Sequence, residues 1–110
     1  MQTRSFDAIL IEVMMETLSS LGESVSQAIL FFLETGYGIE MKNVPQRTRD
    51  FDATIGALLG TGATYLEAAM LNQLYTAIGD DGSLSSGDQR MSFGELVGRA
   101  ADYYRSKVNW

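Results

Sequence analysis

Apolar residues recur at steps of three and four along most of the chain, the spacing of one face of an α-helix. The first run follows Thr3 and Ser5, either of which can cap a helix, and continues to Leu21. A second run over about 21–35 meets Gly36 and Gly38. Glycine ends helices because it adopts the left-handed conformation without steric cost. Three further helices are expected over about 48–59, 62–78 and 92–108.

Some of these helices carry a start signal. Ser92, with Glu95 three residues later, forms a capping box before the last helix. Ser20 and Glu23 form the same pattern before the second helix. Thr48 is expected to cap the third helix.

Two segments lack helical periodicity. Residues 39–44 precede Pro45, which disfavours helical angles at Val44, so an extended connector is expected. Residues 79–90 are rich in glycine, serine and aspartate and predict a loop. The chain therefore predicts one all-α, five-helix compact domain over 1–110, with core 5–79, a longer loop over 79–91 and a C-terminal helix over 92–108.

The first and fourth predicted helices are apolar on more than one face, so each must bury more than one face. In the first, Ile11 and Met15 lie off the main stripe, with Leu18 between the two faces. Such helices are either central to the fold or part of a subunit interface, and the simplest assembly is a symmetric dimer. The candidate interface residues are Ile11, Met15, Leu18, Tyr65, Leu71 and Tyr75.

Composition narrows the possible chemistry. The 110 residues are 45% hydrophobic, which is enough apolar material for one core. The chain has no histidine and no cysteine, so the usual general base, the commonest metal ligand and any thiolate are missing. No nucleophile–base pair can be proposed from the remaining residues. We therefore expect a non-enzyme with no catalytic residue, no cofactor and no metal site.

Hydrophobic runs are short throughout the chain. The first 20 residues carry charges and lack the long apolar region of a signal peptide. The longest apolar run, over 28–33, is far below the ~20 residues that a membrane span needs. A cytoplasmic protein without membrane contact is expected.

The net charge of −6, from 14 acidic and 8 basic residues, would repel nucleic acid. Lys42, Arg47 and Arg49 form the one candidate basic patch, but nearby acidic residues dilute it. Nucleic-acid binding is not expected, and a DNA-binding regulator using Arg47 and Arg49 is a minor alternative.

Four other features could indicate a binding site, but each has a simpler structural explanation. Gly60–Gly62 reads as a tight turn between helices, because the lysine of a phosphate-binding loop is missing. Residues 80–88 read as a solvated linker, because the glutamate that ends a calcium loop is absent. Glu12 and Glu16, one helical turn apart, read as an acidic edge. The C-terminal aromatic residues read as packing residues: Tyr103, Tyr104 and Trp110.

Four stretches of the chain are similar to a known domain: LGESVSQAI (Leu21 to Ile29), FLETGYGI (Phe32 to Ile39), VPQRTRDF (Val44 to Phe51) and LLGTGATYLEAAMLNQLY (Leu58 to Tyr75). They resemble a small archaeal helical domain of uncharacterised function, described as an output domain of Nitrosopumilus-type signalling proteins. The resemblance covers about the middle half of the chain and implies an interaction or output module without catalytic residues.

We therefore expect a non-enzymatic protein–protein interaction or regulatory module that forms homo-oligomers and has an unknown protein partner. The alternative is a small-molecule-sensing domain. It would require a closed apolar pocket with convergent polar groups, for which Gln73 and Tyr75 are the candidates.

Overall fold

The computed structural model describes residues 5–79 and 91–108, and these ranges contain helices and turns without a strand. The predicted all-α fold is confirmed, with five α-helices and one additional short helix in the described ranges. They are α1 (Phe6–Ser19), α2 (Glu23–Tyr37), η1 (Met41–Gln46), α3 (Thr48–Leu59), α4 (Gly62–Ala77) and α5 (Phe93–Val108). The loop predicted over 79–91 falls almost wholly outside the described residues.

The additional helix corrects one prediction. Residues 41–46 form the 3-10 helix η1, whereas the sequence predicted an extended connector over 39–44. Val44 is completely buried, and η1 packs against α1 and α3. Burial of this side chain outweighs the preference that Pro45 imposes on its neighbour. Because proline fixes φ near −65°, it is itself compatible with 3-10 geometry.

The strongest helix-end signals are confirmed. Ser5 Oγ accepts a hydrogen bond of 3.1 Å from the backbone N–H of Ala8 at the start of α1. Ser92 Oγ accepts one of 3.2 Å from the N–H of Glu95 at the start of α5. Gly38, with φ of 64°, ends α2 in the left-handed conformation.

Weaker end signals were wrong. Ser20 does not cap α2, because its hydroxyl donates to the carbonyl of Thr17 at 2.6 Å and Gly22 precedes the helix. Thr48 is the first residue of α3 and not its cap. Gly36 lies inside α2, one residue before its last residue, Tyr37. At Ser20 the carbonyl of Thr17 therefore competes with the cap, and the hydroxyl bonds to the helix before it.

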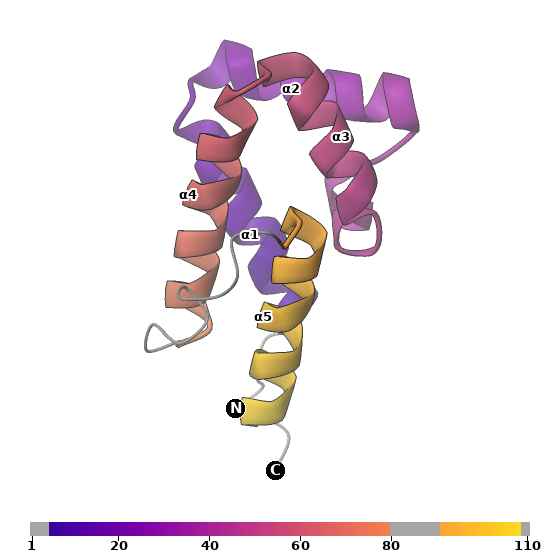
Figure 1. The fold of residues 1–110 in the computed structure, drawn as a ribbon. Coiled ribbons are helices and arrows are strands. Elements are labelled where there is room, and N and C mark those ends of the chain that lie inside the picture. The colour runs from indigo at the N-terminus through magenta and orange to yellow at the C-terminus, as the bar shows by residue number, and fades with distance from the viewer. Residues whose placement is uncertain (1–4, 80–90, 109–110) are drawn as a thin grey trace.

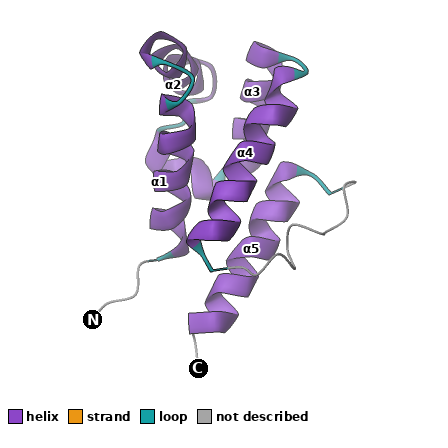
Figure 2. Cartoon of the chain, turned by 90° about the vertical axis from the view of Figure 1, so that its left-hand side faces the viewer, coloured by secondary structure: helices purple, strands orange, loops and turns teal. Residues whose placement is uncertain are grey.

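The helices surround α1 (Figure 1). It packs against α4, η1, α2 and α5, and α2 crosses the end of the molecule where α1 finishes. In Figure 2, α1 and α4 run side by side with α5 below α3. The first helix therefore takes a central position in the fold, and its part in a subunit interface stays a prediction. The fully buried core side chains include Leu10, Met14, Leu18, Leu33, Val44, Phe51, Ile55, Met70 and Leu74.

The last helix belongs to the same core. Phe93 packs on Phe51 of α3, with ring centroids 6.0 Å apart, and Tyr104 packs on Phe6 of α1, at 6.2 Å. Near the other end of α5, Lys107 Nζ donates to the carbonyl of Gly79 at 3.2 Å. A cation at the C-terminal end of α4 also complements the dipole of that helix.

Candidate functional site

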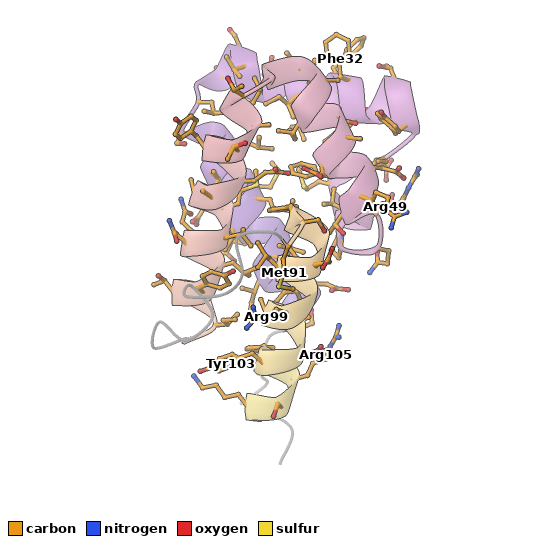
Figure 3. All side chains as sticks on the ribbon, viewed as in Figure 1. Phe32, Arg49, Met91, Arg99, Tyr103 and Arg105 are labelled. Atoms are coloured by element: carbon orange, nitrogen blue, oxygen red, sulfur yellow. The ribbon has the colours of Figure 1, made fainter. Side chains whose placement is uncertain are left out.

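The most unusual surface of the described chain lies on α2. Its predicted apolar stripe divides into two sides: Ile29 and Leu33 are buried in the core, whereas Phe31 and Phe32 are 60% and 46% exposed. Figure 3 shows Phe32 at the end of the molecule that α2 crosses. We call the exposed residues at helical spacing the α2 stripe: Leu21, Val25, Ala28 and Phe32.

The α2 stripe continues into a shallow groove of about 410 Å³. Leu21 and Val25 form one side of this groove, and Tyr65 and Ala69 of α4 form another. Tyr65 is 80% exposed, the largest value for a bulky apolar side chain among the described residues. We call the α2 stripe, Phe31 and this groove the apolar face.

The candidate interface residues separate into three groups. Leu18 and Tyr75 are 0% and 8% exposed, so both belong to the monomer's own core, and their prediction as interface residues was wrong. Ile11 and Leu71 are partly exposed, and Leu71 packs against the core. Met15 and Tyr65 are exposed.

Sequence reasoning missed the exposed aromatic residues of α2 because it assigned them to a buried stripe. A signal was present, since Leu30, Phe31, Phe32 and Leu33 are consecutive and four consecutive helical residues point in four directions. One neighbouring core cannot cover all of them.

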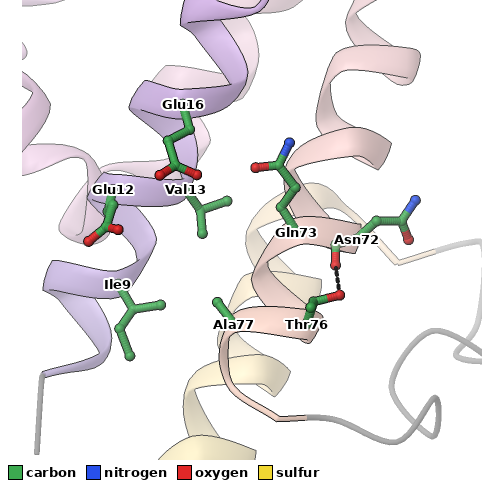
Figure 4. Close-up of a pocket in the computed structure, with 8 residues that line it drawn as sticks. All are labelled: Ile9, Glu12, Val13, Glu16, Asn72, Gln73, Thr76 and Ala77. Atoms are coloured by element: carbon green, nitrogen blue, oxygen red, sulfur yellow. Dashed lines mark hydrogen bonds between the residues drawn. The ribbon is translucent and has the colours of Figure 1, made fainter.

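A second groove, also of about 410 Å³, separates the lower parts of α1 and α4. Figure 4 shows Glu16 and Val13 on α1 facing Gln73 and Ala77 on α4. The floor is apolar and the walls are polar. The lining residues are Ile9, Glu12, Val13, Glu16, Asn72, Gln73, Thr76 and Ala77, which we call the α1–α4 groove.

The α1–α4 groove does not match the predicted sensor pocket. Gln73 lines it, but Tyr75 is buried elsewhere in the core and is not among the lining residues. The expected pair of ligand-binding polar groups therefore does not converge. The groove is also an open channel between two helices, whereas a small-molecule sensor needs an enclosed pocket.

The candidate basic patch is largely engaged in internal contacts. Arg47 Nε donates to Asp50 Oδ2 at 2.9 Å, and Arg47 Nη1 donates to the carbonyl of Tyr37 at 3.1 Å. Arg47 therefore holds the start of α3 against the end of α2. Arg49 points away from the body of the protein (Figure 3). A single exposed arginine beside Asp50 and Asp52 offers little for phosphate recognition.

One carboxyl group has a strongly perturbed pKa. Burial raises the pKa of Glu67 on α4 from 4.5 to about 8, and a hydrogen bond to Asp52 of α3 and the negative charge of Asp52 add to the rise. Glu67 Oε2 is buried without a hydrogen-bond partner. At neutral pH the Glu67 carboxyl is therefore mostly protonated and can donate to the Asp52 carboxylate.

The described residues hold no group of three acidic, histidine or cysteine side chains that could bind a metal ion. The paired acids Glu12 and Glu16 come from a single helix, which agrees with the reading of an acidic edge. Among the helices in the described ranges, none is long and apolar enough to cross a bilayer.

No family model, curated protein or solved structure matches the chain. The resemblance to an archaeal output domain therefore stays a prediction, and the functional argument depends on the surfaces described above.

Proposed function

We propose that this chain is a non-enzymatic protein–protein interaction module that self-associates through the apolar face. The observation that carries the proposal is the exposure of Phe31, Phe32 and Tyr65, at 60%, 46% and 80%. The hydrophobic effect favours covering large aromatic side chains, and the largest apolar patch of a protein often marks an interaction site.

The exposed aromatic area amounts to about half of what a standard interface buries on each partner. An aromatic side chain buries ~150–250 Å² when covered, so these three residues expose roughly 300–450 Å² together. A standard interface buries ~800 Å² on each partner. Leu21 and Val25 add further area, at 39% and 41% exposed. The polar rim of the interface would supply the remainder.

A second copy of the chain is the occupant that we favour. The apolar face combines a projecting side chain, Tyr65, with a groove beside it. In a two-fold dimer the same patch meets itself, so Tyr65 of one copy can enter the groove of the other. The sequence predicted an interface through the first or the fourth of the five long helices, and this arrangement keeps α4 and adds α2.

Charge gives the association a characteristic dependence on salt. The chain carries −6, and α2 bears Glu23 and Glu34 without a basic residue. Two copies therefore repel each other, and added salt screens that repulsion. We expect self-association to strengthen between about 50 and 500 mM NaCl, the range over which the Debye length falls from above 10 Å to a few ångströms.

Sedimentation equilibrium over about 1–200 μM tests the proposal, because typical weak dimers dissociate in this range. Phe32→Asp should give a monomer throughout, since it places a charge among the exposed apolar side chains of α2. Met15→Asp is the matched control: Met15 is 37% exposed on α1 and does not line the groove. Circular dichroism establishes that both variants are folded.

A wild-type protein that stays monomeric at the highest concentration would refute the proposal. Dissociation by Met15→Asp but not by Phe32→Asp would instead place the interface on α1, one of the two helices that the sequence predicted for it.

A further inference from the structure

The α1–α4 groove lies apart from the residues that carry self-association, and its chemistry is different. Its described lining contains two carboxylates, two amides and one hydroxyl, with no lysine or arginine. Ile9, Val13 and Ala77 contribute apolar surface between the polar walls. A complementary ligand must therefore be both cationic and apolar.

We infer that the α1–α4 groove binds a basic amphipathic helix of a partner protein, with lysine or arginine side chains that reach Glu12 and Glu16. This goes beyond self-association, because it assigns a different surface to a different partner. The argument for this occupant is charge complementarity together with the spacing of the two glutamates.

The spacing of the acids matches that of a helical ligand. Glu12 and Glu16 are four residues apart on α1, so their Cβ atoms lie about 5–6 Å apart on one helix face. A partner helix with two basic residues four positions apart presents its charges at the same spacing. Two helices lying side by side can therefore pair both charges at once.

The apolar floor explains why long basic side chains suit the groove. Lysine and arginine place their methylene stems on apolar surface while their charged heads reach outward. Ala77, which is exposed, and the small exposed edges of Ile9 and Val13 can contact the stems, and Glu16 can receive the charge. Glu12 already has one interaction, but a carboxylate has several acceptor positions and can take a second donor.

The opposite wall supplies polar groups that would fix the ligand's position. Thr76 Oγ1 donates to the carbonyl of Asn72 at 3.1 Å, which leaves the hydroxyl oxygen able to accept another bond. The Gln73 amide carries both a donor and acceptors at the rim. These groups can satisfy the exposed polar side chains of a bound helix.

A metal ion or a small amine would be held less well. Hard cations take six or more oxygen ligands, and the groove offers two carboxylates from one helix. A small amine would remain solvated in an open groove, where exposed ion pairs contribute little. A helix covers the floor as well as the charges, which is the usual mode of helix-in-groove recognition.

The test uses a fluorescein-labelled 14-residue peptide with a leucine stripe and two lysines four positions apart. Fluorescence anisotropy measures its binding to the full chain at about 50 mM salt, where exposed charges are least screened. The matched peptide has both lysines replaced by glutamate. We expect the basic peptide to bind, the acidic peptide not to bind, and binding to weaken as salt rises, opposite to self-association.

Two protein variants separate the groove from the overall charge. Glu16→Lys should weaken peptide binding about tenfold or more, as expected for reversing one charge in an interface. Asp102→Lys makes the same change in net charge at an exposed position on α5 outside the groove, and should change binding by about twofold at most, as a screened distant charge does.

Phe32→Asp should leave peptide binding unchanged, which distinguishes failure of this inference from failure of self-association. The inference is overturned if the basic peptide does not bind, or if the acidic peptide binds equally well. Equal weakening by Glu16→Lys and Asp102→Lys would also overturn it, as would a change in oligomeric state caused by Glu16→Lys.

Discussion

Replacing Glu67 by glutamine should remove a pH dependence of stability that the structure builds into the contact between α3 and α4. In the folded state the pKa of Glu67 is raised from 4.5 to about 8, chiefly by burial and then by Asp52. Between these two values the folded chain holds a proton that the unfolded chain releases. The free energy of unfolding therefore falls as pH rises from about 4.5 through about 8.

The size of this effect can be bounded. At about 1.36 kcal/mol per pKa unit, the rise corresponds to at most roughly 5 kcal/mol. Because Glu67 is only half-buried, solvent screening reduces this to roughly 1–2 kcal/mol. Glu67→Gln keeps the size of the side chain and a donor toward Asp52, but it does not ionise. Relative to wild type, the variant should gain ~1–2 kcal/mol between pH 5 and pH 9.

Urea unfolding followed by circular dichroism at pH 5, 7 and 9 measures this difference. The chain suits the experiment because it has no histidine or cysteine, the side chains that normally titrate in this range. Glu34→Gln, at an exposed position on α2, is the control, and its difference from wild type should stay constant within about 0.5 kcal/mol.

A wild type and a Glu67→Gln variant with the same pH dependence would contradict the reasoning. That result would mean that Glu67 ionises in the folded protein as it does in the unfolded chain, and that α3 and α4 do not shield it from water.

Two further predictions concern helix ends. Gly38→Ala should destabilise the protein by about 1 kcal/mol, because alanine is strained at the φ of 64° that ends α2. Gly36→Ala, inside the same helix and with nothing within 4 Å of an added Cβ, should instead stabilise the protein by about 0.5–1 kcal/mol. If the urea midpoints of the two variants move in the same direction, Gly38 is not the residue whose left-handed conformation ends α2. Ser92→Ala should cost about 1 kcal/mol through loss of the cap on α5, whereas Ser106→Ala, exposed near the other end of that helix, should leave the thermal midpoint nearly unchanged.

The amino-acid sequence by itself determined where the five α-helices lie and some of their ends. Helical periodicity predicted all five α-helices, and side chains that act within one turn, such as Ser5 and Ser92, marked two of their starts. Gly38 marked the end of α2, because its own backbone adopts the left-handed conformation there. Such a cap joins groups three residues apart in the chain, so no distant segment is needed to bring them together, although Ser20 shows that a nearer carbonyl can take the bond.

Tertiary structure decided which apolar surfaces are covered and which polar groups meet. Periodicity shows that Phe32 and Ile29 share α2, but only the position of the neighbouring helices leaves one exposed and buries the other. The pairing of Asp52 with Glu67 likewise joins two helices whose local sequences carry no sign of the contact. Val44 forms part of a helix because the core accepts its side chain, although its local sequence favours an extended segment. In each case the deciding energy is burial against residues far along the chain, which a local pattern does not contain.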